Sequence, residues 1–245
     1  MVNVFLTISY DGTNYSGWQR QKNAVSVQGA VELALSGLLK TDIVITGASR
    51  TDAGVHALCQ KAAFFIDGIK IPMNKLPLAI NAALPKDIVI TKAEIIEDGR
   101  HPRFSAKQKT YEYRIFNDKF MNPLLRNYCW HVQKTLNIRH MAAAAEYIKG
   151  THDFTAFCAS GSDTKDFVRT VFDLEIDVKG KVVSVTITGN GFLYNMARII
   201  TGTLCYVGLG KIAPEDIKGI ILSKDRTLSG ITAPPQGLTL LDIVY

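Results

Sequence analysis

Hydrophobic residues follow clear periods along the chain, and these periods predict a series of strands and helices. Apolar and other residues alternate over 2–10, which predicts a strand. Helical spacing predicts an amphipathic helix over 25–39, with its apolar stripe at Val27, Val31, Leu35 and Leu38. Short apolar runs predict strands at 43–46, 59–66 and 88–96, and a helix at 73–84. The resulting order is β-α-β-β-α-β, as in ferredoxin-like and RNA-recognition domains.

A second series follows the basic connector 99–104. Its expected elements are a strand over 109–116, a helix from Asn137 to Gly150, a hairpin of 170–178 with 181–188, an apolar helix over 192–207, a short helix from Pro214 and a strand over 238–244. We therefore expect an α+β protein of two ferredoxin-like domains, 1–104 and 105–245. Their sheets should be mainly antiparallel, with the active site in a central cleft.

The composition is that of a globular protein without membrane or disulfide signals. The chain has 245 residues, 47% of them hydrophobic, which is enough for one large core or two smaller ones. Its four cysteines are scattered without a Cys-x-x-Cys pair, which predicts reduced thiols in a cytoplasmic protein. The N-terminus lacks the basic region of a signal peptide, and no apolar run reaches the length of a membrane span.

The charge balance is compatible with a nucleic-acid partner. The formal net charge is +6 and the sequence pI is about 9.1. Lys and Arg that neutralise phosphates release counterions and so favour binding to RNA or DNA. Many basic enzymes bind no nucleic acid, so charge alone does not decide the matter.

The segment Arg50-Thr-Asp-Ala-Gly-Val-His56 is open to three interpretations. Asp52 can simply occupy a turn after a strand, because its side chain bonds nearby backbone N–H groups. Asp52 and His56 can also meet on one helical turn and hold a metal. Gly54 disfavours that helix, and no third ligand stands nearby. In the third interpretation Asp52 is a catalytic carboxylate.

Seven collinear segments resemble the bacterial tRNA pseudouridine synthase A family along nearly the whole chain. They are Tyr10-Asp-Gly-Thr-Asn-Tyr-Ser-Gly-Trp-Gln19, Gly47-Ala-Ser-Arg-Thr-Asp-Ala-Gly-Val-His56, Arg103-Phe-Ser-Ala106, Lys109-Thr-Tyr-Glu-Tyr-Arg114, Gly150-Thr-His-Asp-Phe-Thr-Ala-Phe157, Gly191-Phe-Leu-Tyr-Asn-Met-Ala-Arg-Ile-Ile-Thr-Gly202 and Ala233-Pro-Pro-Gln-Gly-Leu238.

The resemblance implies an isomerase that converts uridine to pseudouridine at positions 38, 39 and 40 of the tRNA anticodon arm, without cofactor or metal. It implies that Asp52 is the catalytic aspartate and that Arg198 pairs with it. It further implies that Tyr111 stacks on the target uracil and that Arg50 helps to extrude the nucleotide. A homodimer that binds tRNA across both subunits is implied as well.

Other basic residues are candidates for the RNA-binding surface, among them Arg20 and Arg103, although each can equally belong to a solvated face. Two functions from other classes stay open on the residues alone. One is a non-catalytic RNA-binding module, and the other is a metal-dependent RNA nuclease that uses Asp52 and His56.

Overall fold

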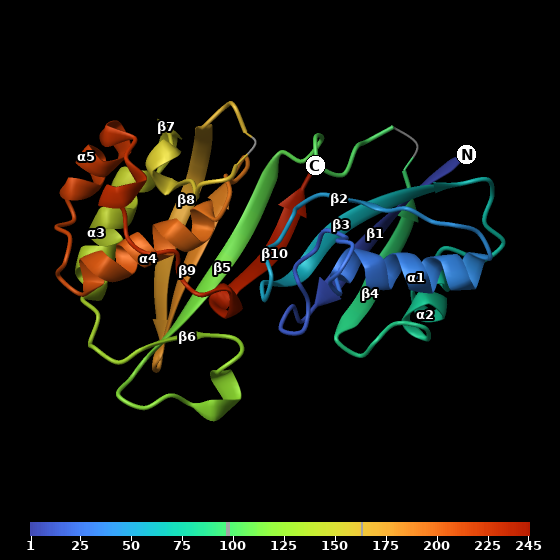
Figure 1. Ribbon diagram of the computed structural model, residues 1–245, viewed down its shortest axis with the longest axis horizontal. Coiled ribbons are helices and arrows are strands. Elements are labelled where there is room, and N and C mark those ends of the chain that lie inside the picture. The colour runs from blue at the N-terminus through green and yellow to red at the C-terminus, as the bar shows by residue number, and fades with distance from the viewer. Residues whose placement is uncertain (97–98, 163) are drawn as a thin grey trace. The chain divides into compact units, whose positions relative to one another are not determined.

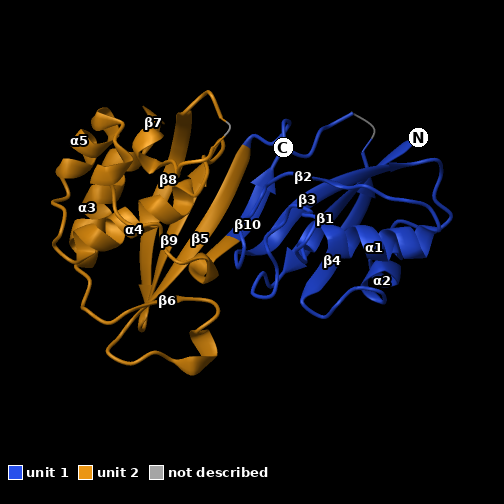
Figure 2. Cartoon of the chain, viewed as in Figure 1, with its two compact units in different colours: residues 1–107, 240–245 blue, residues 108–239 orange. Residues whose placement is uncertain are grey.

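The computed structural model describes residues 1–96, 99–162 and 164–245 (Figure 1). Within these residues the protein is a mixed α/β protein whose strands pair mainly in antiparallel fashion. The chain divides into two compact units, drawn in blue and orange in Figure 2. The first consists of Met1–Lys107 with Leu240–Tyr245, and the second of Gln108–Thr239.

This division differs from the predicted domains 1–104 and 105–245 in two places. The boundary falls after Lys107, and the C-terminal segment Leu240–Tyr245 belongs to the first unit. A local pattern predicts that 238–244 is a strand but not which unit receives it, because strand pairing between distant segments leaves no periodic signal.

The strands of the first unit form an antiparallel arrangement around β1 (Val2–Tyr10). β1 lies between β3 (His56–Ile66) and β4 (Ile88–Ile95) and pairs with both. The short β2 (Thr46–Gly47) also pairs with β3, and β10 (Leu238–Val244) follows β3 in the sheet order. Of the segment predicted as a strand at 43–46, only Thr46 lies in a strand, β2. The loop that carries Asp52 follows β2 directly.

The helices α1 (Val27–Leu39) and α2 (Leu76–Asn81) belong to the first unit and lie in contact. α1 begins where the Ser26 side chain accepts a hydrogen bond from the N–H of Gly29 at 3.2 Å, which is an N-cap. The predicted apolar stripe of α1 is confirmed, with complete burial of Val27, Val31 and Leu35. The helix predicted over 73–84 is shorter than expected.

The second unit has the sheet order β5-β9-β8-β7, all antiparallel, with β6 parallel to β5. These strands are β5 (Gln108–Asn117), β6 (Trp130–Val132), β7 (Gly150–Asp153), β8 (Val168–Lys179) and β9 (Val182–Gly189). The predicted hairpin is confirmed as β8 and β9, and Gly180 takes the left-handed conformation (φ +62°) in its turn.

Three α-helices belong to the second unit, and α3 packs against both others. They are α3 (Ile138–Ile148), α4 (Met196–Gly208) and α5 (Asp216–Ser223). Four short 3-10 helices are η1 (Pro123–Leu125), η2 (Thr155–Phe157), η3 (Arg226–Leu228) and η4 (Pro235–Gly237). The predicted cap of α3 is confirmed, since the Asn137 side chain accepts from the N–H of His140.

The apolar helix predicted over 192–207 begins only at Met196. Asn195 immediately before it has φ +59°, a left-handed conformation that a helix cannot continue through. Hydrophobic residues lie on both sides of this turn, so a prediction based on apolarity alone does not detect where the helix begins. The later start places Arg198 in the first turn of α4.

Candidate active site

The loop between β2 and β3 carries Asp52 and reverses direction at that residue. The N–H of Val55 donates to the carbonyl of Asp52 at 3.2 Å, and Gly54 has the left-handed φ of +77° that this turn requires. Thr51 is buried, Asp52 is half-buried and Arg50 is exposed. Asp52 thus lies in a turn that follows a buried residue, and its own side chain is only partly exposed.

A cradle for this loop comes from the segment after β1. The N–H of Trp18 donates to the carbonyl of Thr51 at 3.0 Å, and the N–H of Gly54 donates to the carbonyl of Tyr15 at 3.3 Å. The Tyr10 and Thr51 hydroxyl oxygens are 2.7 Å apart in a buried hydrogen bond. The main chain on both sides of Asp52 is therefore fixed by residues about forty positions earlier in the chain.

Two glycines allow the cradle and the loop to approach so closely. Gly17 has φ +89°, and a Cβ added there would lie 2.6 Å from the carbonyl oxygen of Thr51. A Cβ on Gly47 would lie 2.3 Å from Nε1 of Trp18, whose ring is 1% exposed. The resemblance singled out this Tyr10–Gln19 segment only as a family feature. Its glycines beside a tryptophan were the signal that it packs against another backbone.

A buried polar network joins α1 to the strand that leads into the loop. The Glu32 carboxylate is 5% exposed and accepts from Nη1 of Arg20, Nε2 of Gln28 and the N–H of Ile45, each at 3.0 Å. A buried carboxylate needs such partners, because its desolvation is otherwise unfavourable. Arg20 therefore stabilises the first unit through Glu32, and its predicted contact with RNA stays a prediction.

His56, the other member of the suggested metal pair, is buried and contacts the segment that follows β1. It is 5% exposed, and its Nδ1 lies 3.1 Å from the backbone nitrogen of Gly12 and 3.1 Å from Oδ1 of Asp11. These contacts tie the start of β3 to the end of β1. Among the residues that the structure describes, no group of three or more His, Cys, Asp or Glu side chains is arranged to hold a metal ion.

Arg50 and Arg103 lie near enough for their charges to interact. Partial burial lowers the pKa of Arg103 from its ordinary value, and the positive charge of Arg50 lowers that pKa further. Both residues are exposed, so the pair forms a cationic spot on the surface of the first unit. Two like charges side by side are stabilised by an anion between them, and an RNA phosphate is one such group.

In the second unit, Arg198 is held from two sides. Its Nε–H donates to the carbonyl of Ala233 at 2.7 Å, and its Nη1–H donates to Oδ1 of Asn195 at 2.9 Å. The N–H of Ala233 in turn donates to the Arg198 carbonyl at 3.2 Å. The residue is half-buried in the first turn of an otherwise apolar helix. The guanidinium is thus oriented before any substrate arrives.

The two tyrosines of β5 share a buried face, as their alternation predicts. Tyr111 is 6% exposed, and its ring meets that of Phe192 edge to face, with centroids 5.0 Å apart. Tyr113 is fully buried and donates its hydroxyl hydrogen to the carbonyl of Pro234 at 2.6 Å. Burial raises the pKa of Tyr113, while the positive charge of Arg198 opposes that shift. Tyr113 therefore supports the segment around Arg198.

Arg226 secures the same segment from η3. Its Nη1 donates to Oγ of Ser229 and to the carbonyl of Gly230, both at 2.9 Å, and its Nη2 donates to Oγ1 of Thr232 at 3.1 Å. These bonds end one residue before Ala233, the acceptor of the Arg198 side chain. Local sequence patterns do not mark Arg226, because the contacts that explain it form only in the folded chain.

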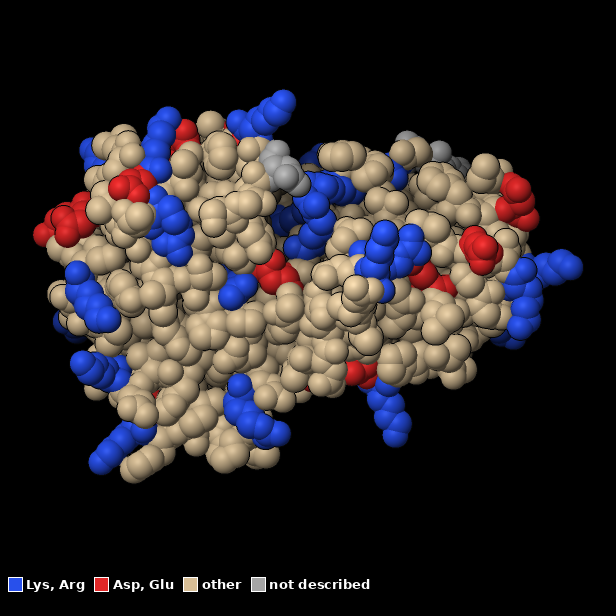
Figure 3. Space-filling view, in the orientation of Figure 1, with Lys and Arg blue, Asp and Glu red and all other residues tan. Residues whose placement is uncertain are grey.

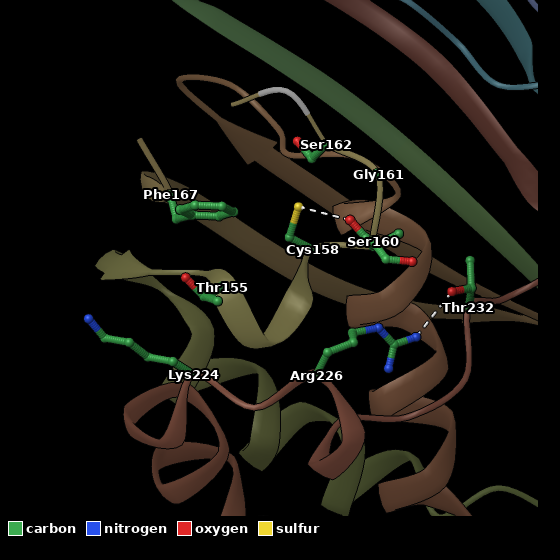
Figure 4. A pocket seen from close by; sticks show the side chains of 10 residues that line it. Thr155, Cys158, Ser160, Gly161, Ser162, Phe167, Lys224, Arg226 and Thr232 are labelled. Carbon is green, nitrogen blue, oxygen red and sulfur yellow. Dashed lines mark hydrogen bonds between the residues drawn. The ribbon is translucent and has the colours of Figure 1, made fainter. Parts of the chain in front are cut away.

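A pocket of about 530 Å³ opens beside Arg226 (Figure 4). Its lining combines hydroxyl, thiol, cationic and aromatic groups, including Thr155, Cys158, Phe167, Lys224, Arg226 and Thr232. The view shows Arg226 turned toward Thr232. Lys224 is bonded to Asp153 at 2.7 Å, which lowers the pKa of that carboxyl. The described lining contains none of the site residues predicted from the sequence.

The predicted site residues are distributed over both units. The first unit holds Asp52, Arg50, Arg103 and Arg20, and the second holds Tyr111 and Arg198. On the face drawn in Figure 3, Lys and Arg side chains are more widespread than Asp and Glu over each unit. No helix in the described part of the chain is long and apolar enough to cross a membrane.

Comparison with known proteins gives a consistent result over the full length. A family model described as tRNA pseudouridine synthase matches residues 6–105 and 143–245. A protein named tRNA pseudouridine synthase A from Thermoanaerobacter sp. (strain X514) is 54% identical over 245 residues, covering 100% of both chains. A protein of the same name from Caldicellulosiruptor saccharolyticus is 49% identical over 100% of both chains. Another, from Bacillus subtilis (strain 168), is 43% identical over 98% of this chain and 97% of its own.

Proposed function

The chain belongs to the tRNA pseudouridine synthase family, so it is an isomerase that acts on tRNA, and we propose that its targets are the uridines at positions 38, 39 and 40 of the anticodon arm. The observation that carries the assignment of its centre is the Asp52 loop. Its backbone is hydrogen-bonded on both sides to Tyr15 and Trp18, which fixes the main chain that carries the half-buried aspartate.

The reaction exchanges one bond of the nucleotide for another. The glycosidic bond between C1′ and N1 breaks, the uracil turns, and a bond forms between C1′ and C5. The hydrogen on C5 leaves as a proton, and N1 gains one. Product and substrate have the same atoms and the same oxidation state, so the chemistry requires neither a redox cofactor nor a second substrate.

Asp52 is the residue that we assign to this chemistry. A carboxylate can stabilise positive charge at C1′, attack covalently or accept the proton from C5. Each role uses the negatively charged carboxylate, and in the proposal the guanidinium of Arg198 pairs with it. The hydrogen bonds of Arg198 to Asn195 and Ala233, which orient the guanidinium, support this role.

Tyr111 and Arg50 are assigned to the substrate. Tyr111 stacks on the extruded uracil, and its edge-to-face contact with Phe192 holds the ring for that purpose. Arg50 is exposed next to the buried Thr51, so it can enter the RNA while its backbone stays fixed. Extrusion of a nucleotide costs a few kcal/mol, and phosphate contacts such as those proposed for Arg103 and Arg20 offset it.

We also propose the finer architecture and assembly. The neighbours β4, β1 and β3 in the first unit, with the short β2 also paired to β3, support a ferredoxin-like domain, and α3, β8, β9 and α4 in the second support a similar one. The enzyme acts as a cytoplasmic homodimer, in which one moderately basic chain reads the shape of tRNA together with its copy.

The test is tritium release from tRNA labelled at uridine C5, because C5 loses its hydrogen in the reaction. Wild type should release tritium in EDTA and leave the RNA at full length. Asp52→Ala and Asp52→Asn should release none while binding tRNA normally. Asp42→Asn, at an exposed position of the same unit, is the matched control and should act as wild type.

Each outcome separates the alternatives. No release by wild type from any tRNA overturns the proposed function, and normal release by the Asp52 variants overturns the assignment of the catalyst. Shortened RNA products that form without a chelator but not in EDTA would identify a metal-dependent nuclease. Binding without any change in the RNA would identify a non-catalytic RNA-binding module.

A further inference from the structure

A tight turn in the first unit is organised by one imidazole. Nδ1 of His101 accepts hydrogen bonds from the N–H groups of Arg103 (3.0 Å) and Phe104 (3.2 Å). The N–H of His101 donates to Oγ of Ser105 at 3.1 Å, and the N–H of Ser105 donates back to the carbonyl of His101 at 3.1 Å. Four hydrogen bonds within five residues make this turn a preformed structure rather than a loose loop.

The turn presents an aromatic ring to solvent. Phe104 is 77% exposed, the highest value for an aromatic residue in the described part of the chain. Its ring lies nearly parallel to that of His101, with centroids 4.5 Å apart and an interplanar angle of 30°. Single exposed hydrophobic residues are ordinary on protein surfaces. Phe104 differs because the ring of His101 stacks on it and the same imidazole accepts a hydrogen bond from its backbone N–H.

Positive charge lies beside this ring. The guanidinium carbon of Arg103 lies 5.7 Å from the centroid of the Phe104 ring, and the charge of Arg50 acts on Arg103. Large contiguous apolar patches mark protein-binding surfaces, and Phe104 is a single ring. One exposed ring next to arginines matches the combination that binds single-stranded nucleic acid, in which bases stack on aromatic faces and phosphates meet Arg.

We propose that Phe104 is a stacking platform for an unpaired base of the tRNA substrate, with Arg103 and Arg50 on phosphates of the same strand. The inference rests on the proposed function and adds a substrate contact to it. Phe104 binds the RNA in the ground state and in the transition state alike, so its contribution belongs to affinity and KM and not to kcat.

The first experiment compares Phe104→Ala with wild type in tRNA binding and tritium release. Loss of one base–aromatic stack corresponds to about a 5- to 150-fold weaker Kd. KM should rise by the same factor, and kcat at saturating tRNA should be unchanged. Phe104→Tyr keeps a stacking ring and should restore most of the affinity. Because the side chain is largely exposed, none of these variants is expected to alter folding.

The matched control is Phe120→Ala. Phe120 is 75% exposed and also has a cation beside its ring, with Nζ of Lys119 at 5.3 Å from the centroid. It lies in the second unit, outside the His101 turn. The control should bind tRNA as wild type does. An equal loss in both variants would show a general effect of surface aromatic residues and would overturn the proposal.

The second experiment detects stacking directly through Phe104→Trp. The chain has two tryptophans, Trp18 (1% exposed) and the half-buried Trp130, so the difference from wild type isolates the new indole. Its fluorescence should be quenched by the tRNA substrate and by a single-stranded oligonucleotide, and much less by a duplex. His101→Ala in the Trp background should weaken the quenching, because the turn loses its common acceptor.

The two proposals fail in different ways. Without tritium release by wild type, the proposed function falls whatever Phe104 does. If wild type releases tritium, but Phe104→Ala binds tRNA normally and the Trp variant is not quenched, the platform is overturned and the proposed function stands. A Phe104→Ala enzyme that loses kcat at unchanged Kd would also overturn it.

Discussion

The hydroxyl oxygen of Tyr10 lies 2.7 Å from that of Thr51, in a hydrogen bond buried within the first unit. Thr51 directly precedes Asp52, so the last residue of β1 holds the residue that leads into the proposed catalytic aspartate. The N–H of Trp18 holds the carbonyl of the same threonine at 3.0 Å. The position of Asp52 along the first unit is thus determined by a segment that has no catalytic group of its own.

Removal of this bond tests its importance. Tyr10→Phe leaves the Thr51 hydroxyl buried without its partner, so the free energy of unfolding should fall by about 1–3 kcal/mol. The single-turnover rate of tritium release should fall as well, because the backbone before Asp52 gains freedom. Thr91→Val removes a hydroxyl bond elsewhere in the unit, to the carbonyl of Thr7, and should leave the rate unchanged. A Tyr10→Phe enzyme with wild-type rate would show that the loop is held without this bond.

Gly17 should be intolerant of even one methyl group. Gly17→Ala adds a Cβ 2.6 Å from the carbonyl of Thr51 and requires a left-handed alanine at φ +89°. Gly68→Ala is the control, because Gly68 has φ +79° with open space around it. Backbone strain alone should cost about 1–2 kcal/mol in each variant. Gly17→Ala should be less stable in urea unfolding than Gly68→Ala, and only Gly17→Ala should lose activity. Equal effects of the two variants would show that the contact with Thr51 makes no contribution.

Arg198→Lys should separate catalysis from binding. A lysine cannot reproduce the planar guanidinium that bonds Ala233 and Asn195 and that, in the proposed function, pairs with Asp52. We expect kcat to fall by about 100-fold or more, with the Kd for tRNA within a few-fold of wild type. Arg169→Lys makes the same exchange at another arginine of the second unit and should leave kcat unaltered. Parallel changes of Kd and kcat in Arg198→Lys would contradict the pairing with Asp52.

The buried thiol of Cys205 should make the protein less stable in alkali. Burial raises the pKa of Cys205 to about 12, above its ordinary value of 9.0. Between these values the unfolded chain loses a proton that the folded chain keeps. Stability is therefore full below pH 9 and falls as pH rises toward 12, by up to about 1.4 kcal/mol per pH unit for this thiol. Urea unfolding between pH 7.5 and 10.5 measures the slope, which Cys205→Ala should reduce. If Cys205→Ala leaves the slope of stability against pH unchanged, other titrating groups cause the loss of stability.

Local periodicity was sufficient for most elements of secondary structure. The strand at 2–10, the helix at 25–39, the β8–β9 hairpin and the cap of α3 were all predicted, because each depends on neighbours within a few positions. Errors occurred where local signals disagreed. The helix from 192 was extended through Asn195, since apolarity continues across a residue whose backbone conformation ends the helix.

Motif order identifies the family and draws attention to Asp52, because it is a property of the amino-acid sequence. What holds the Asp52 loop depends on tertiary contacts, because the bonds from Tyr10, Tyr15 and Trp18 cross some forty positions and leave no periodic pattern. For the same reason, local sequence patterns do not mark Arg226 and do not show which unit β10 joins. Hydrogen bonds and close packing between distant segments depend on the three-dimensional path of the backbone, whereas local sequence patterns predict only individual helices, strands and turns.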